Sequence, residues 1–191
     1  MLNIILRTHN RPIKFKRMLD CIQKQSFQNF NLYITADNDE TESYVKQYSL
    51  PYIRMFPDTT IPVFYNLYFN DIYQKIDNGW IWGIDDDDLL ADDNVFQFIN
   101  DTCILEDKIY IFKFHNKHAR CIRPGRNFGK KIEIGDIGTA NFVVNRKYCC
   151  DVLWGANGIS DGIYISNVAK NREICWIDKV IYVVEKANHG T

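Results

Sequence analysis

The sequence predicts an α/β fold, a single domain with a mostly parallel central sheet flanked by helices. Short apolar segments of strand length alternate with segments whose apolar residues recur at helical spacing, and polar loops follow the strands. The length of 191 residues suits one domain with one core. Ligands of such sheets bind at the carboxyl ends of the strands, so the loops there are the candidates for a site.

Residues 2–6 open the chain with an apolar run of the kind that forms a buried strand. Phe15, Met18, Leu19 and Ile22 then recur at i, i+3, i+4 and i+7, which places one apolar stripe on a helix. By the same criteria, the first half continues with strands at 30–34, 51–56 and 80–84 and helices at 42–48, 62–76 and 95–102.

The second half of the chain is less regular. Strands are expected at 109–112, 142–144 and 180–184, and a helix at 162–170. Residues 113–131 contain seven lysines and arginines and no acid, which predicts a long basic loop or ribbon. Such a segment is most often a solvated surface, and it lacks the periodic aromatic residues of a nucleic-acid platform.

Composition and charge exclude several classes of protein. With a net charge of −1, 46% hydrophobic residues and 25% charged residues, the chain has no global field that would attract nucleic acid. No apolar stretch reaches the 18 residues expected of a membrane span. The six cysteines include no CxxC pair, so we expect reduced thiols in a cytoplasmic protein, or in one held at a membrane only through a partner.

Four consecutive aspartates, Asp85 to Asp88, follow the strand expected at 80–84. Side chains alternate along an extended segment, so Asp85 and Asp87 can face a ligand together, while Asp86 faces elsewhere and should be the most replaceable. Mg²⁺ and Mn²⁺ prefer such oxygen ligands and share them with substrate phosphates. A solvated loop or a helix N-cap is the alternative, but four like charges at a strand end cost stability unless a cation, most simply a metal, offsets them.

These segments resemble the family 2 glycosyltransferases of the GT-A fold, and the resemblance runs over nearly the whole chain. Residues 4–12 look like the family's opening strand and its T-x-N-R-P loop, residues 34–39 like its second strand, and residues 82–90 like its D-x-D-D segment. The resemblance implies that one set of residues binds the donor nucleotide: Thr8, Asn10, Arg11, Asp37, Asp39, Asp85 and Asp86. Within this set Asp85 would lie near the ribose, and the neighbouring Asp87 would ligate the metal.

Three later segments are similar to further elements of the family. Gly138, Thr139 and Ala140 look like the glycine loop that approaches the donor sugar, although Gly138 could simply permit a turn. Asp161 stands where the family carries the catalytic base, but Ser160 replaces the usual Glu before it, and Asp161 could instead cap the following helix. His189, near the end of the chain, looks like the C-terminal histidine that completes the metal site of the family. The resemblance therefore implies that Asp87 and His189 are the metal ligands, although His189 could be an ordinary surface histidine.

The function implied by the resemblance is sugar transfer within one Rossmann-like GT-A domain over 1–191. Residues 1–90 would form the nucleotide-binding half and residues 91–191 the acceptor and catalytic half. With Mn²⁺ or Mg²⁺ bound, the domain would move a sugar from a nucleotide-diphosphate donor to a hydroxyl of a glycan or glycoconjugate. The donor that the resemblance usually implies is a UDP-sugar. Asp161 would take the proton of the acceptor hydroxyl, which implies inversion at the anomeric carbon. The basic segment would then contact the acceptor or the diphosphate, and further domains of a longer polypeptide are compatible with the sequence.

Other classes of protein share parts of this pattern. A nucleotidyltransferase should carry a glycine-rich phosphate loop after the first strand, and residues 7–10 contain no glycine. A phosphatase with an Asp nucleophile should carry Thr or Val shortly after its D-x-D, whereas Leu89 and Leu90 follow here. A non-catalytic nucleotide-sugar-binding module of a larger assembly is the stronger alternative, because the chain is compact and has Ser160 in place of Glu.

Overall fold

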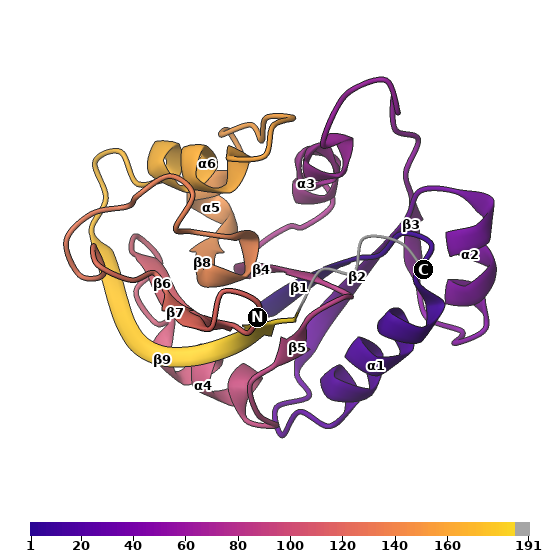
Figure 1. Ribbon diagram of the computed structural model, residues 1–191, viewed down its shortest axis with the longest axis horizontal. Helices are drawn as coiled ribbons and strands as arrows, with labels where there is room; N and C mark the ends of the chain where they lie inside the picture. The colour runs from indigo at the N-terminus through magenta and orange to yellow at the C-terminus, as the bar shows by residue number, and fades with distance from the viewer. Residues whose placement is uncertain (186–191) are drawn as a thin grey trace.

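One sheet runs through the computed structural model, which describes residues 1–185 (Figure 1). Within those residues the strand order is β3-β2-β1-β4-β8-β6-β9-β5, and β7 pairs with β6. The strands are β1 (Leu2–Arg7), β2 (Phe30–Ala36), β3 (Tyr52–Arg54), β4 (Trp80–Asp85), β5 (Leu89–Leu90), β6 (Ile109–Asn116), β7 (Cys121–Arg123), β8 (Phe142–Asn145) and β9 (Ile174–Val184).

The sheet joins a parallel half to a mixed half. Strand β1 pairs in parallel with both β2 and β4, and β2 pairs in parallel with β3. Strand β8 then runs antiparallel to β4 and to β6, while the long strand β9 is parallel to β6. The predicted α/β fold is confirmed, and the parallel strands predicted from the first half of the chain are the ones that present their carboxyl ends together.

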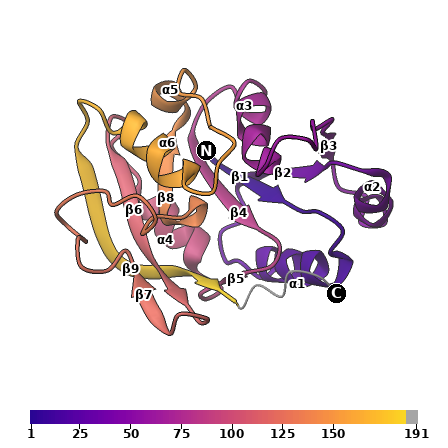
Figure 2. The same cartoon turned by 45° about the horizontal axis from the view of Figure 1, so that its top comes forward.

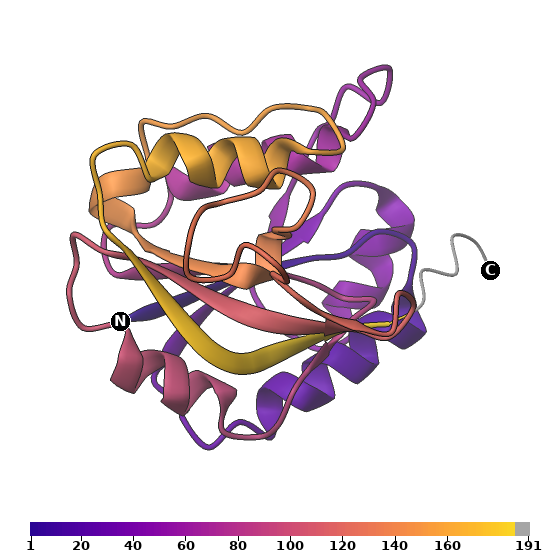
Figure 3. The same cartoon turned by 60° about the vertical axis from the view of Figure 1, so that its left-hand side comes forward.

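Helices cover both faces of the sheet, as the side view in Figure 3 shows. They are α1 (Pro12–Gln23), α2 (Asp39–Lys46), α3 (Tyr68–Tyr73) with the preceding 3₁₀ helix η1 (Phe64–Leu67), α4 (Val95–Thr102), α5 (Arg146–Cys149) and α6 (Ser160–Val168). Helices α1, α2 and α4 contribute to one hydrophobic cluster, and α3, α5 and α6 contribute to another. The sheet therefore separates two cores.

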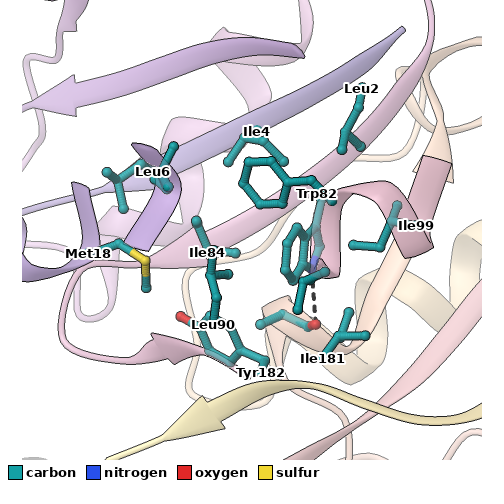
Figure 4. Packing of buried hydrophobic residues seen from close by; sticks show 14 of the residues in the cluster. Leu2, Ile4, Leu6, Met18, Trp82, Ile84, Leu90, Ile99, Ile181 and Tyr182 are labelled. Atoms are coloured by element: carbon teal, nitrogen blue, oxygen red, sulfur yellow. Dashed lines mark hydrogen bonds between the residues drawn. The ribbon is translucent and has the colours of Figure 1, made fainter. Parts of the chain in front are cut away.

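Alternation along β1 and β4 explains the two cores. Ile4 of β1 faces the α1 side and Ile5 faces the α3 side, because successive side chains of a strand point to opposite faces. Trp82 of β4 lies fully buried in the first cluster, where Figure 4 shows it among aliphatic side chains and Tyr182. Its indole nitrogen donates a hydrogen bond of 3.0 Å to the backbone carbonyl of Ala140. The core thus fixes the backbone of the loop that contains Ala140.

Several elements occur at their predicted positions but begin or end at other residues than predicted. The four residues of the apolar stripe on α1 are all buried, as predicted. The helix predicted from residue 62 is instead a 3₁₀ turn followed by α3, because Val63 adopts a left-handed φ of 58° that an α-helix does not continue through. Helix α6 begins at Ser160, so Asp161 lies in its first turn and Ile159 is the N-cap residue.

The basic segment predicted at 113–131 forms the end of β6, the β6–β7 hairpin and the loop that follows it (Figure 2). Part of its positive charge is paired, since Lys113 contacts Asp178 and Lys117 contacts Glu185. Among residues 1–185, no helix combines the length and the apolar character that crossing a bilayer requires.

Candidate functional site

Two neighbouring hollows lie at the carboxyl ends of β1 and β4. The first hollow is lined by the 7–11 loop, three aromatic side chains and three carboxylates: Phe64, Tyr65, Tyr68, Asp37, Asp85 and Asp87. The second hollow is lined mainly by residues of later elements: Asn66, Asp88, Gly138, Thr139, Ala140, Asn141, Asp161 and Tyr182. Their volumes are about 550 and 220 Å³, and only the first reaches the size of a typical ligand pocket. Arg7, Tyr65 and Asp85 line both, so the hollows adjoin.

The Arg7–Asp85 ion pair stands where the hollows meet. Arg7 Nε and Nη2 donate to the two carboxylate oxygens of Asp85 at 2.8 and 2.9 Å, a bidentate geometry. The guanidinium also lies 4.9 Å from the ring centre of Phe69 and 5.4 Å from that of Tyr65. Burial opposes the charged form, but the nearby acidic groups, Asp85 foremost and Asp161 after it, together raise the pKa of Arg7 above its ordinary value. Arg7 is therefore a permanent cation held in one orientation.

Asp86 points into the protein, which confirms that it faces away from Asp85 and Asp87. It is fully buried and lines neither hollow. Thr8 donates to one of its oxygens at 2.6 Å, and the guanidinium of Arg11 lies 2.6 Å from the other. Burial raises the pKa of Asp86 to about 7. Asp86 is therefore not positioned to contact a nucleotide, contrary to what the resemblance implied. This carboxylate ties the loop after β1 to the acidic run, which argues against the expectation that Asp86 is the most replaceable of the four.

Asp87 and Asp88 complete the acidic run and differ in their surroundings. Asp87 lines the first hollow and accepts a hydrogen bond of 2.6 Å from Arg11. Asp88 is buried at the second hollow, where it accepts one from the backbone of Glu185. Burial, and after it the charges of Asp85 and Asp87, raise the pKa of Asp88 to about 8. No cation pairs with Asp88 among residues 1–185, so a divalent cation shared by these carboxylates would relieve their repulsion.

Arginines already offset much of the acidic charge that the sequence assigned to a metal. Arg7 pairs with Asp85, and Arg11 lies against both Asp86 and Asp87. Residues 1–185 contain no preassembled group of three or more His, Cys, Asp or Glu side chains with metal-binding geometry. His189, the second expected ligand, lies outside the described residues.

Asp37 lines the first hollow with its carboxylate already engaged. Tyr68 donates to one oxygen at 2.8 Å, the His9 Nδ1 atom is 2.7 Å from the same oxygen, and Thr41 bonds the other. The side chain of Asp37 is 2% exposed, whereas that of His9 is 53% exposed. Asp37 therefore supports the hollow, and His9 presents the open polar edge there.

The remaining residues expected at the nucleotide divide into two groups. Thr8, Asn10 and Arg11 all line the first hollow, as the resemblance implies. Asn10 adopts a left-handed φ of 49° and is anchored by its backbone N–H to Thr41. Asp39 does not line the hollow: it is the first residue of α2, its side chain is 98% exposed, and it pairs with Arg54. The helix start turns Asp39 away from the site.

Asp161 faces the glycine loop across the second hollow. Its carboxylate accepts a hydrogen bond of 2.8 Å from Thr139, the first residue of 3₁₀ helix η2 (Thr139–Asn141). Burial raises the pKa of Asp161, with Arg7 acting in the opposite direction. Gly138 donates its backbone N–H to the side chain of Asn141, which fixes the turn. The structure thus brings together the two later segments that the sequence singled out.

The structure adds functional residues that the sequence did not indicate. Asn66 lies off the apolar stripe of its helix and carried no signal, yet it accepts a hydrogen bond of 2.7 Å from Arg7. The sequence indicates only that Tyr182 belongs to a strand, but its hydroxyl accepts a hydrogen bond from the backbone N–H of Asp85 and donates one to the backbone carbonyl of Asp85. Both contacts join residues far apart in the chain.

This fold, with acidic strand ends at the junction of two hollows, is the GT-A glycosyltransferase fold. No family model and no curated protein matches the sequence itself. Among solved structures, it matches residues 1–349 of TarS from Staphylococcus aureus in complex with UDP-GlcNAc, with a TM-score of 0.73 and 16% identity over 99% of this chain and 59% of that one. It also matches a mannosyltransferase from Pyrobaculum calidifontis in complex with GDP-Man and Mn²⁺, with a TM-score of 0.70 and 13% identity over 99% of this chain and 58% of that one. The chain therefore spans less than two thirds of the length of either.

Proposed function

We propose that the chain is a glycosyltransferase that moves a sugar from a nucleotide-diphosphate donor to a hydroxyl of a glycan or glycoconjugate acceptor, with inversion. The observation that carries the proposal is the junction of the hollows at Arg7 and Asp85. A donor bound in the first hollow would place its sugar toward the second, where the buried Asp161 faces Thr139. Donor and base would then lie on opposite sides of the reacting carbon.

The nucleotide would occupy the first hollow with its base among the aromatic side chains. Tyr65, which is 46% exposed, offers a ring for stacking, and the exposed edge of His9, held by Asp37, offers a hydrogen bond to the base. Asp85 would lie at the ribose, as the sequence suggested. A uridine donor is proposed from the family resemblance, and the two neighbouring structures are complexes with UDP-GlcNAc and GDP-Man.

A divalent metal would be held by Asp87, with Asp85 and Asp88 beside it. Support comes from the absence of a cationic partner for Asp88 within residues 1–185 and from the Mn²⁺ in the mannosyltransferase complex. When bound, Mn²⁺ or Mg²⁺ would supply positive charge that stabilises the departing diphosphate. Arg11, which lies against the same carboxylates, is positioned to bind phosphate oxygens as well.

Asp161 would act as the base in a single displacement. It would take the proton of the acceptor hydroxyl while the new bond to the anomeric carbon forms and the bond from that carbon to the diphosphate oxygen breaks. Thr139 bonds one oxygen of Asp161, which orients the carboxylate for its task. The raised pKa makes Asp161 a stronger base than an ordinary aspartate. Attack opposite the leaving group gives inversion.

The organisation and location of the protein remain part of the proposal. Residues 1–90 would form the nucleotide half and residues 91–191 the acceptor half of one domain. The chain spans about 59% of the TarS structure, and we propose that a longer polypeptide or a partner contributes to acceptor binding. All six cysteines are free, which agrees with a cytoplasmic location.

Calorimetry with UDP and GDP, each with and without Mn²⁺, tests the nucleotide site, and a donor-hydrolysis and transfer assay tests catalysis. The proposal expects binding that Mn²⁺ strengthens, followed by turnover. Binding without turnover on any acceptor would instead favour a nucleotide-sugar-binding module, an alternative that the short span of the chain keeps open. If Asp161→Asn left transfer intact while Asp87→Asn abolished it, the base assignment would be wrong and the metal assignment would stand.

A further inference from the structure

A chain of buried hydrogen bonds connects Asp85 with the segment that carries Asp161. Arg7 binds Asp85 through two of its nitrogens and donates from the third, Nη1, to the Asn66 side-chain oxygen at 2.7 Å. The Asn66 amide nitrogen donates in turn to the hydroxyl of Ser160 at 2.5 Å. Arg7, Asn66 and Ser160 are 6%, 4% and 1% exposed, so water does not substitute for these contacts.

A second branch reaches Asp161 through Thr139. Arg7 Nη2 lies 3.4 Å from the Thr139 hydroxyl, and this hydroxyl donates to Asp161 at 2.8 Å. Asp161 is therefore held by Thr139 through its side chain and by Ser160 through the backbone of α6. Both supports lead back to Arg7.

We infer that Asn66 is a positioning residue which, together with Ser160, sets Asp161 relative to Asp85. The inference rests on the proposed function, in which these two carboxylates serve the acceptor and the donor. An amide is suited to this place because it can accept from Arg7 and donate to Ser160 at the same time. It also accounts for Ser160 where a Glu was expected: a carboxylate there would compete with Asp85 for Arg7, whereas the small hydroxyl accepts from Asn66.

Asn70 provides a matched comparison one helical turn after Asn66. Its side chain accepts from the backbone N–H of Trp154 at 2.8 Å and donates to the Trp154 carbonyl at 3.2 Å. It thus fastens the chain ahead of α6, where Asn66 also donates to the backbone carbonyl of Asn157 at 3.4 Å. Unlike Asn66, Asn70 lines neither hollow and does not contact Arg7. Loss of either asparagine should lower the stability of the protein, but only loss of Asn66 should change the position of Asp161 relative to Asp85.

The test compares Asn66→Ala, Ser160→Ala, their double variant and Asn70→Ala in the full chain. We expect Asn66→Ala to lower kcat by roughly 10- to 100-fold, since small misplacements of reacting groups have effects of that size. The dissociation constant for UDP should change by less than about threefold, and the double variant should be about as slow as Asn66→Ala alone, because both changes break one chain. Asn66→Asp should not recover the rate, because its buried carboxylate would compete with Asp85 for Arg7 and cannot donate to Ser160.

Hydrogen exchange supplies a readout that does not depend on turnover. In the wild-type protein, UDP with Mn²⁺ should slow amide exchange in the first turn of α6, and in Asn66→Ala this slowing should be lost. Equal kcat losses in Asn66→Ala and Asn70→Ala, additive losses in the double variant, or slowing that persists in Asn66→Ala would each overturn the inference. A wild-type protein without transferase activity would refute the proposed function, and hydrogen exchange alone would then decide whether Asn66 couples the two sides.

Discussion

The Thr139 hydroxyl donates a hydrogen bond of 2.8 Å to the carboxylate of Asp161, and this contact holds the proposed base in the second hollow. Thr139 also lies at the start of the loop whose backbone is fixed by Trp82 of the core. The position of Asp161 therefore depends on the packing of β4, and the predictions below test the site through both chemistry and packing.

Replacing the proposed base should abolish most transfer without affecting nucleotide binding. Asp161→Asn keeps the size of the side chain and can still accept from Thr139, but it cannot take a proton. We expect kcat to fall by roughly 10²- to 10⁴-fold, the usual contribution of a placed base. The dissociation constant for UDP, measured by calorimetry, should be unchanged. Asp39→Asn, at an exposed carboxylate outside both hollows, is the matched control and should behave as wild type.

The pH dependence of transfer should show the raised pKa of Asp161. The charged carboxylate is the active form, so kcat/KM should rise as pH increases through the pKa of Asp161. Burial raises this pKa, so the acid limb should lie above the ordinary aspartate value of about 3.9. Values of kcat/KM measured from pH 4 to 9, with the folded fraction checked at each pH, locate this acid limb. A limb at or below the ordinary value would show that Asp161 is not the titrating group.

Removing the charge of Asp88 should stabilise the metal-free protein at alkaline pH. Its pKa is raised to about 8 in the folded state, so the folded protein binds the extra proton and stability falls as pH rises from about 4 to 8. Asp88→Asn should be more stable than wild type by about 1–3 kcal/mol at pH 8 and about equal at pH 4. Urea denaturation without metal measures both. A variant less stable at pH 8 would mean that the charged form of Asp88 is well compensated.

The same Asp88→Asn variant should bind Mn²⁺ more weakly if Asp88 lies beside the metal. Calorimetric titration with Mn²⁺ in the presence of UDP measures this affinity. Greater stability without metal, combined with weaker metal binding, is the expected signature, because one charge causes both effects. Unchanged Mn²⁺ affinity would leave Asp87 and Asp85 as the proposed metal ligands and exclude Asp88.

A methyl group at Gly83 should disrupt the support of Thr139. A Cβ atom there would lie 2.7 Å from both the ring of Phe69 and the Thr139 methyl group, so these side chains would have to move. Gly83→Ala should destabilise the protein by about 1–3 kcal/mol, the usual cost of overpacking, and should also lower kcat. Gly158→Ala, where a Cβ would meet nothing within 4 Å, is the stability control. Equal stability of the two variants would contradict the packing described for β4.

The strands and the α1 helix could be predicted because their signals are local. Buried runs such as 2–6 and 80–84, and the stripe that includes Phe15 and Ile22, depend only on which neighbouring residues are apolar. The helix expected from residue 62 was predicted with the wrong start because one backbone angle, at Val63, interrupts a pattern whose apolar spacing is otherwise helical.

The site was predictable in its types of residue and less so in its contacts. The outward direction of Asp85 and Asp87 follows from alternation along a strand, and the structure confirms it. The position of Asp39 outside the first hollow could not be predicted, because it depends on where α2 begins. The burial of Asp86 could not be predicted either, because it depends on tertiary contacts with Thr8 and Arg11.

The sequence alone determined the α/β fold and the acidic strand end, and it offered Asp161 and the glycine loop as two separate candidate features. Tertiary structure decided which groups these features meet. Arg7 contacts Asn66 and Thr139 across 59 and 132 positions of the chain, and Asn66 reaches Ser160 across 94. Periodicity reports only on neighbours within a helix or strand, so contacts over such separations exist only after the sheet has brought its strands side by side.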